Sequence, residues 1–335
     1  MLRASRVLSG ATLVLVVVAA GALGAERKAA FTDPAQAGPD FAVQGEYAGK
    51  VETGEGEVQY GVQVIALGGG KFRAVGYPGG LPGAGWNKEE KVAAEGQTID
   101  GLTTFTVPDG ARTATIKDGI MTVKDPDGTT VATFKKIERR SPTLGAKPPA
   151  GAVVLFDGTT AEHFVGGRMT PDGLLMEGAT SKQKFGSFTI HLEFRTPFEP
   201  YARGQGRGNS GFYAQGRYEV QILDSFGLEG ENNECGGIYG VRKPDVNMCL
   251  PPLSWQTYDV DFTAAEFKDG KLVSPARMSV RHNGVLIHED VAIPHATVAA
   301  PVRQGPETGP VFLQNHGNPV RFRNIWVVER GASKP

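Results

Sequence analysis

Residues 187–196 read SFTIHLEFRT, and this stretch decides the fold class. Its apolar side chains fall at every second position, at Phe188, Ile190, Leu192 and Phe194, with polar side chains between them. Successive side chains of a strand point to opposite faces of a sheet. This period therefore predicts a β-strand with one buried face and one polar face.

The same alternation recurs in shorter runs along the rest of the chain, each bounded by turn residues. Clear examples lie at residues 103–107, 113–117, 258–262 and 320–328. The 46 glycines and 22 prolines are spread throughout, and no window keeps a helical period. Many short antiparallel strands with frequent turns predict an all-β protein built around a sandwich.

The N-terminal segment, residues 1–25, has the parts of a secretory signal. Arg3 and Arg6 precede a short apolar run, and small residues follow it up to Ala25. The run is shorter than the ~20 residues that a spanning helix needs, although an uncleaved anchor is the alternative. We expect an exported protein, periplasmic or extracellular, with no membrane span after signal cleavage.

Composition divides the rest of the chain into four segments. They are a flexible polar leader (26–40), an accessory antiparallel β domain (41–140), a proline-rich semi-rigid linker (141–151) and a β-sandwich domain (152–330). The accessory domain is smaller than the sandwich and shows no cluster of reactive residues. We therefore expect its deletion to leave turnover of a small substrate intact.

Charge and cysteine content exclude one class of partner and leave one question open. The formal net charge is −1 at pH 7, which argues against nucleic acid, because its recognition needs a concentrated basic patch. Cys235 and Cys249 lie in one stretch rich in Gly, Pro and Asn. In an oxidising compartment they can form a disulfide, and two free thiols are the alternative.

One glycine motif has a misleading spacing. Residues 206–211, GRGNSG, fit the pattern GxGxxG, but a dinucleotide-binding loop must follow a strand and open a helix. Here a β-patterned run follows the glycines, so we reject a nucleotide site. The glycines are better explained by a loop that passes close to a ligand or a neighbouring strand.

The candidate site follows these glycines, in residues 216–225. Val220 and Ile222 share one face of the predicted strand. The polar candidates are Arg217, Glu219 and Gln221 on the opposite face, Asp224 just past the strand, Asn209 before it, and Gln314 and His316 near the C-terminus. Sugar hydroxyls both donate and accept hydrogen bonds, so this set favours a carbohydrate site over a merely solvated sheet face.

Several short motifs of the sandwich region occur together in the order of a known family. They are VLFDG (154–158), NSG (209–211), YEVQILDS (218–225), WQTY (255–258), QNHG (314–317) and VRFRNIW (320–326). With them, residues 152–330 resemble the DUF1080 family, also described as 3-keto-disaccharide hydrolase or 3-keto-glucoside lyase and hydratase. The resemblance implies a concanavalin A-like jelly roll with its active site on the concave sheet.

The resemblance also implies a reaction, β-elimination from a 3-keto sugar. The C3 ketone acidifies the C2 proton, a base removes it, the aglycone leaves C1, and water adds to the enone. His316 or Glu219 is the predicted base, with Asp224 as partner acid. The predicted substrate contacts are Asn209, Tyr213, Arg217, Gln221, Gln314 and Arg321. No cofactor is fixed, but a divalent ion such as Ca or Mn, held by Glu219 and Asp224, is a candidate.

The expected ligand is a carbohydrate, an oxidised disaccharide or another glycoside. Two other functions toward such a ligand remain open. Conventional glycoside hydrolysis needs two carboxyl groups that flank the bond, and Glu219 and Asp224 are the candidates. A non-catalytic carbohydrate-binding module instead needs an aromatic platform, for which Tyr213, Tyr218 and Trp255 are available.

Overall fold

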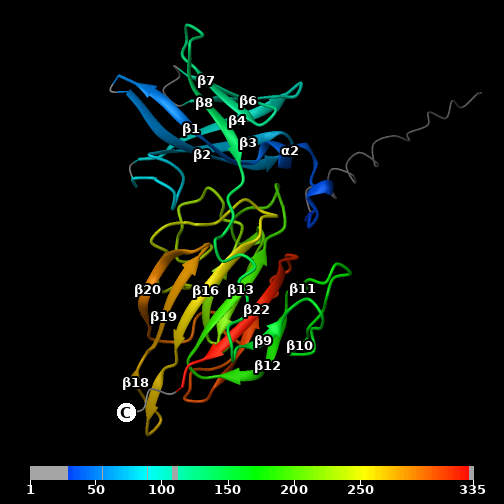
Figure 1. The fold of residues 1–335 in the computed structure, drawn as a ribbon, viewed down its shortest axis with the longest axis vertical. Helices are drawn as coiled ribbons and strands as arrows, with labels where there is room; N and C mark the ends of the chain where they lie inside the picture. The colour runs from blue at the N-terminus through cyan, green and yellow to red at the C-terminus, as the bar shows by residue number, and fades with distance from the viewer. Residues whose placement is uncertain (1–28, 55, 89, 108–111, 332–335) are drawn as a thin grey trace, which may run out of the picture.

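The computed structural model describes residues 29–54, 56–88, 90–107 and 112–331. It is an all-β protein in which a barrel stands on one end of a two-sheet sandwich (Figure 1). The predicted signal, residues 1–25, lies outside the described residues. Within the described ranges, no helix is long and apolar enough to cross a membrane.

The N-terminal part closes into an eight-stranded antiparallel barrel. Its strands are β1 (Gly45–Thr53), β2 (Gly56–Gly68), β3 (Lys71–Pro78), β4 (Val92–Ile99), β5 (Leu102–Thr106), β6 (Thr113–Lys117), β7 (Ile120–Lys124) and β8 (Thr130–Ile137). Pairing of β1 with β8 completes the circle, so neither strand is left as an open edge. The turn at Asp118 and Gly119 has positive φ at both residues, as a tight hairpin requires.

The C-terminal part is a sandwich of two antiparallel sheets. The five-stranded sheet has the order β10 (Phe164–Val165), β12 (Ala179–Phe185), β21 (Gly309–Leu313), β14 (Ser210–Ala214) and β15 (Tyr218–Ile222). The seven-stranded sheet has the order β11 (Leu175–Met176), β22 (Arg321–Glu329), β13 (Phe188–Arg195), β16 (Gln256–Thr263), β19 (Ala276–His282) and β20 (Val285–Ile293), with β9 (Val153–Phe156) also on β22. A hairpin of β17 (Glu266–Lys268) and β18 (Lys271–Ser274) projects separately.

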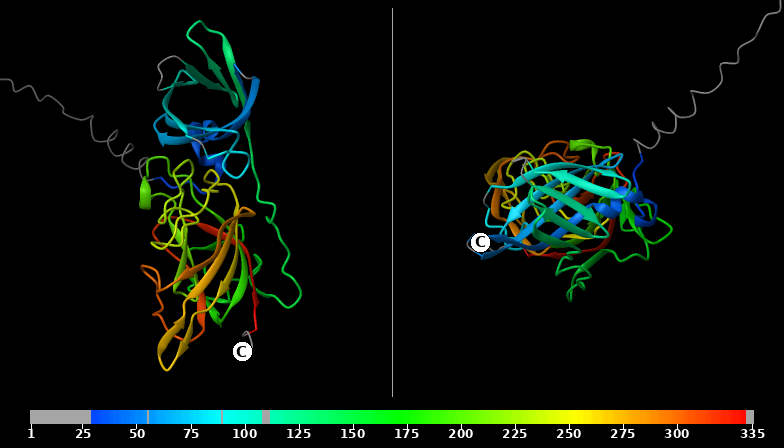
Figure 2. Two further views of the ribbon diagram at one scale, coloured as in Figure 1. Left: turned by 90° about the vertical axis from the view of Figure 1, so that its left-hand side faces the viewer. Right: turned by 90° about the horizontal axis from the view of Figure 1, so that it is seen from above.

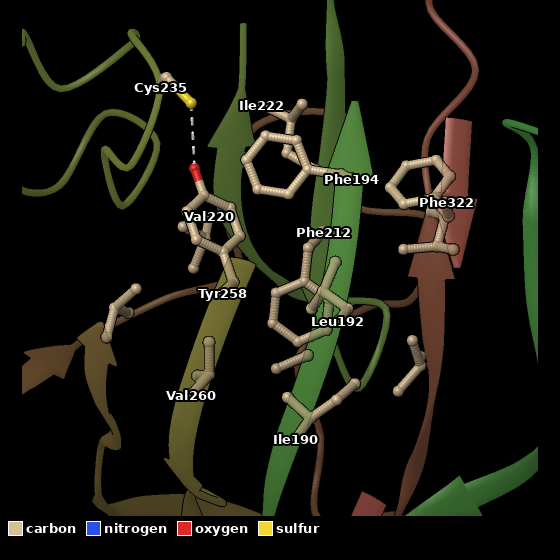
Figure 3. Packing of buried hydrophobic residues seen from close by; sticks show 14 of the residues in the cluster. Ile190, Leu192, Phe194, Phe212, Val220, Ile222, Cys235, Tyr258, Val260 and Phe322 are labelled. Atoms are coloured by element: carbon tan, nitrogen blue, oxygen red, sulfur yellow. Dashed lines mark hydrogen bonds between the residues drawn. The ribbon is translucent and has the colours of Figure 1, made fainter. Parts of the chain in front are cut away.

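The alternating segment that opened the sequence analysis is strand β13, near the middle of the seven-stranded sheet. Its four apolar side chains are fully buried. Figure 3 shows Ile190, Leu192 and Phe194 facing Phe212 and Val220 of the other sheet. Burial of these side chains between the sheets supplies the core, because removing apolar surface from water is the main favourable term in folding.

The opposite face of β13 is also buried, which the alternation alone did not predict. His191 and Glu193 are covered by the predicted linker, which runs along the side of the sandwich (Figure 2, left). Several hydrogen bonds hold the linker. Among them, Thr143 Oγ1 donates to Asp259 at 2.7 Å, Gly145 N donates to Glu193 at 2.6 Å, and Trp326 Nε1 donates to the Ala146 carbonyl at 3.2 Å. The linker is therefore docked along this face.

The predicted flexible leader is also ordered over its described part. Residues 29–40 contain a 3-10 turn, η1 (Pro34–Gln36), and the start of a short helix, α2 (Gly38–Val43). Phe31 exchanges two backbone hydrogen bonds with Phe198 of the sandwich, at 3.0 and 2.9 Å. This correction has a simple cause. The polar composition of the segment obscures Phe31, which packs against Phe198 together with Phe41, the first residue after the segment.

The barrel and the sandwich share a packed interface. Ile65 and Tyr77 of the barrel belong to the same hydrophobic cluster as Phe226 and Met248 of the sandwich. Arg203 and Arg207 donate to the carbonyl groups of Leu67 and Ala66, at 2.8 and 3.1 Å. Deletion of the barrel would expose this apolar surface. The structure therefore argues against the expectation that the sandwich works unchanged without the barrel.

Candidate active site

The register of the five-stranded sheet decides which side chains share the candidate site. Phe212, Val220 and Leu313 point into the core. Tyr213 lies opposite Glu219 on the paired strands β14 and β15, and their side chains point to the outer face of this sheet. Gly211 pairs with Gln221 one step further along the same face. The predicted strand and its alternation thus bring Glu219, Gln221 and Tyr213 together.

Glu219 is a buried carboxyl without a charged partner. The residue is 2% exposed, and the Tyr213 hydroxyl hydrogen-bonds its carboxyl. Burial raises the pKa of Glu219 to about 8, against the opposing effect of the Tyr213 hydrogen bond. Among the described residues, no neighbouring charge contributes to this shift. A carboxyl with such a pKa can take or give a proton near neutral pH.

Three neighbouring residues fix the Glu219 and Tyr213 pair in place. The Tyr213 hydroxyl accepts a hydrogen bond from Gln314 Nε2 at 3.1 Å and lies 3.4 Å from the Val298 carbonyl oxygen. The Glu219 backbone N–H donates to Thr297 Oγ1 at 3.0 Å. Residues 297 and 298 therefore cover the pair from the connection between β20 and β21. Gln314 brings the C-terminal part of the predicted site into contact with the β14–β15 part.

Gly211 makes room for the Glu219 carboxyl. A Cβ atom at this position would lie 2.3 Å from Glu219 Oε1 and 2.9 Å from a Tyr213 ring carbon. The sequence reading that these glycines allow a close approach fits this geometry, since the approaching group is a side chain of the neighbouring strand.

We expect Gly211→Ala to lower turnover by more than tenfold, because the added Cβ atom must displace the Glu219 carboxyl. The matched control is Gly206→Ala in the preceding loop, where an added Cβ meets nothing within 4 Å. Steady-state kinetics and thermal unfolding of both variants provide the check. Equal turnover in the two variants would show that the position of the Glu219 carboxyl does not matter.

Three amide side chains form the polar part of the site beside Glu219. Gln221 Nε2 donates to Gln205 Oε1 at 3.0 Å, and Asn209 Nδ2 donates to the same oxygen at 3.1 Å. Asn209 Oδ1 is buried and has no hydrogen-bond partner. An unsatisfied buried acceptor is rare in proteins, and a ligand hydroxyl would satisfy it.

Other predicted members of the site are engaged elsewhere. Arg217 is fully buried, and it holds the connection before β21 by donating to the Arg303 and Glu307 carbonyl oxygens, both at 2.7 Å. Asp224 Oδ2 accepts from Arg207 Nε at 2.6 Å, in the contact that ties the sandwich to the barrel. Both side chains thus stabilise the frame of the site.

Two further predicted residues are not placed with Glu219. Arg321 lies on β22 of the seven-stranded sheet, where it pairs with Glu177 at 2.7 Å on the face turned away from the core. It is therefore on the opposite side of the sandwich from Glu219. His316 is exposed in the turn after β21 and makes no hydrogen bond to another described residue. Imidazole can serve as a base, but here nothing orients it.

The donor set does not fit a protein-bound divalent ion. Within the described ranges, no group of three or more His, Cys, Asp or Glu residues could hold a metal. Of the two predicted ligands, Asp224 is occupied by Arg207, and Glu219 stands without a second carboxyl. Ca²⁺ and Mn²⁺ favour several oxygen ligands, so we assign no step to a metal.

The two cysteines are buried free thiols, so the disulfide alternative is wrong for this structure. Cys235 Sγ lies 3.3 Å from the Tyr258 hydroxyl, a contact drawn in Figure 3. Cys249 Sγ lies 3.5 Å from the Leu223 and Leu250 carbonyl oxygens. Both sulfur atoms are thus held by polar groups within the core.

Of the three aromatic candidates for a sugar platform, the site contains only Tyr213. Tyr218 packs in the core against Phe262, and the Trp255 ring lies between Arg195 and Arg323 on the other sheet. The aromatic residue that the sequence analysis missed is Phe312, half-buried on β21 with its ring 5.3 Å from that of Tyr213.

Comparison with models of known protein families identifies the sandwich domain. A family model described as the 3-keto-alpha-glucoside-1,2-lyase-like domain matches residues 151–328. The chain belongs to this family. The match spans the whole sandwich and leaves the barrel outside. The predicted resemblance to 3-keto-disaccharide hydrolases is therefore confirmed.

One solved structure agrees with this assignment. A protein of Parabacteroides distasonis, named a "putative glycosyl hydrolase", is 32% identical with a TM-score of 0.51, over 55% of this chain and 86% of its own. A second protein of that organism and name is 19% identical with a TM-score of 0.40, over 54% of this chain and 94% of its own. No curated protein matches the chain. The family and its first structural neighbour point to a carbohydrate-active hydrolase.

Loop residues that no alternation could identify complete the surroundings of the candidate site. Glu199 accepts from Asn318 Nδ2 at 2.9 and 2.8 Å and from Gly208 N at 2.6 Å, so it fixes the loop before Asn209. Burial raises the pKa of Glu199, and the hydrogen bonds from Asn318 and Gly208 oppose that shift. Gln205 and Asn318 both lie outside strands, where sequence gives no register.

Proposed function

We propose that the sandwich domain cleaves 3-keto-glycosides by β-elimination, with Glu219 as the base. The observation that carries the proposal is the Glu219 carboxyl, which is buried beside Tyr213 with its pKa raised to about 8 by burial. A base of this strength is suited to a carbon acid, since proton transfer is most efficient when the catalytic pKa lies near the working pH.

The proposed reaction balances without an added oxidant or reductant. The Glu219 carboxylate takes the C2 proton, and the C–H electron pair forms the enolate across C2 and C3. The enolate then re-forms the C3 ketone and creates a C1–C2 double bond as the aglycone oxygen leaves C1. The leaving oxygen takes a proton. Water adding at C1, with proton return to C2, gives net hydrolysis.

The environment of Glu219 favours this route over conventional glycoside hydrolysis. The latter needs a second carboxyl group about 5 to 9.5 Å away, as nucleophile or as base. Asp224 is held by Arg207, and no charge perturbs Glu219 among the described residues. One isolated carboxyl is enough for abstraction of a proton next to a ketone.

The neighbouring polar groups provide sugar contacts of the required type. Asn209 Oδ1 can accept a hydroxyl, and the amides of Gln314 and Gln221 offer donors and acceptors near Glu219. Half-buried Phe312 offers an apolar surface to a sugar ring. Because Glu219 is 2% exposed, a substrate reaches the carboxyl only after the groups around it move.

The decisive experiment offers the full chain a nitrophenyl glucoside and its 3-keto derivative at equal concentration. The proposal expects release of nitrophenol from the 3-keto substrate alone, with a primary isotope effect when C2 carries deuterium. Equal or faster cleavage of the unoxidised glucoside, without an isotope effect, would establish conventional hydrolysis instead. Binding of both sugars without turnover would support a carbohydrate-binding module.

The pH dependence of kcat/KM follows from the pKa of Glu219. A base must be deprotonated to act, and below a pKa of about 8 the deprotonated fraction falls tenfold per pH step. We therefore expect kcat/KM on the 3-keto substrate to rise with pH and level off above about 8. A profile that falls through this pH would mean that Glu219 acts as an acid.

A further inference from the structure

The barrel contains a cavity that is separate from the site on the sandwich. Its volume is about 610 Å³, and it opens beside Val92, which is 42% exposed. An eight-stranded barrel is just wide enough either to be filled by its own side chains or to hold one small ligand. A volume in the range of 300 to 1,000 Å³ is typical of ligand sites, whereas packed interiors leave few voids larger than a water molecule.

Small inward-facing side chains produce this cavity. Ala74 pairs with Ala94, and around the barrel Ala114, Val123 and Ala132 are successive partners in the register. Their side chains line the cavity together with larger ones such as Phe105 and Met121. Alanine at these four lining positions, 74, 94, 114 and 132, leaves room in the lumen.

The other end of the barrel is closed. Tyr47, Phe72 and Ile116 fill the lumen there, and Phe198 and Leu253 of the sandwich pack against the same cluster. The cavity is therefore a pocket with one closed end. The residues of the closed end separate the cavity from the sandwich.

The chemistry of the wall excludes a charged or sugar-like ligand. Charged lining residues are confined to Glu90, Lys91 and Arg112, and the rest of the lining is glycine, aromatic or otherwise hydrophobic. Lys91 is paired with Glu229, and Arg112 with Asp125 at 2.8 Å. Apart from Glu90 and the Tyr60 hydroxyl, the described residues of this wall offer no free polar partner, so a charge or a set of hydroxyls inside it would lose more hydrogen bonds to water than it gains.

We propose that the barrel binds one uncharged, apolar small molecule, aromatic or aliphatic, within its lumen. This proposal is independent of the reaction on the sandwich. It adds a binding site to a domain in which the sequence showed no cluster of reactive residues, because the cavity arises from closure of the barrel.

The test uses the neutral fluorescent probe N-phenyl-1-naphthylamine with the full chain. We expect saturable binding of one equivalent with increased, blue-shifted emission. Ala132→Phe places a ring in the lumen and should weaken binding at least tenfold. Thr133→Phe is the matched control, because Thr133 is the next residue on β8 and is exposed. Ala114→Leu, with Thr115→Leu as its control, repeats the comparison with a smaller change, in case Ala132→Phe fails to fold.

A second readout locates the probe. In protein labelled at methionine methyl groups, the Met121 resonance should shift on probe binding, because Met121 lines the cavity. Competition by neutral apolar compounds, and none by free sugars, is also expected. Absence of saturable binding would overturn the proposal. So would folded lumen variants that bind the probe as tightly as their outward-facing controls.

Discussion

Glu219→Gln is expected to reduce kcat/KM on a 3-keto-glycoside by about 10²- to 10⁴-fold, the usual contribution of a general base. Glutamine keeps the shape of the side chain and can still accept the hydrogen bond from Tyr213, but it cannot take the C2 proton. The measurement is steady-state turnover of the two proteins across the pH range in which the unmodified chain is active. Glu289→Gln is the control, because Glu289 is an exposed carboxyl on the other sheet.

The same substitution should stabilise the fold at high pH, which separates loss of the base from misfolding. In the unfolded chain Glu219 has an ordinary pKa near 4.5, and in the folded chain its pKa is about 8. The folded state therefore holds the proton more tightly, and folding stability falls as pH rises from about 4.5 to 8. Glutamine lacks this loss. The variant should therefore gain roughly 5 kcal/mol above pH 8, at about 1.4 kcal/mol for each unit of pKa shift, and little at pH 4.

Urea unfolding at pH 4 and pH 9 measures this difference. A variant that is inactive, equally stable at pH 4 and more stable at pH 9 would support a buried base held at a cost to stability. Retained turnover would instead exclude Glu219 as the base and leave His316 as the candidate base. A gain of stability that is the same at both pH values would mean that the pKa of Glu219 is not raised.

Alternation along one strand could predict part of this site, because it depends only on local geometry. It correctly placed Glu219 and Gln221 on the face opposite Val220. It could not place Arg217, because the preceding turn at Gln215 and Gly216 has positive φ and breaks the strand period. Asp224 and His316 likewise lie beyond the ends of their strands, where period two no longer applies.

A second limit is that alternation does not reveal which sheet a strand joins. Arg321 is on the polar side of its strand, as predicted, but β22 belongs to the seven-stranded sheet. Its polar face is therefore separated from Glu219 by the thickness of the core. The barrel shows the same limit. Its strands could be predicted from the sequence, but the pairing of β1 with β8 could not, because it joins residues that are far apart in the sequence. The lumen exists only because of that pairing.

Arg207→Met should cost about 3 to 5 kcal/mol of folding stability, the usual effect of leaving one partner of a buried ion pair alone. Arg207 and Asp224 are 5% and 3% exposed, and Arg207 Nε lies 2.6 Å from Asp224 Oδ2. Loss of the guanidinium also removes the bond to the Ala66 carbonyl of the barrel. The midpoint of urea unfolding measures the loss. As control, Lys50→Met breaks an exposed pair with Glu57 and should leave the midpoint of urea unfolding nearly unchanged.

The double variant Arg207→Met with Asp224→Leu decides between a structural and a catalytic role for Asp224. Replacing both members of a buried ion pair by apolar residues is often neutral, so this variant should recover most of the lost stability. If Asp224 only anchors Arg207 and the barrel, the double variant should keep most of its turnover on the 3-keto substrate. A stable double variant with turnover as low as that of Glu219→Gln would make Asp224 the second reacting group. It would then restore the two-carboxyl mechanism, because elimination at one isolated carboxyl has no use for Asp224 beyond the frame that it holds.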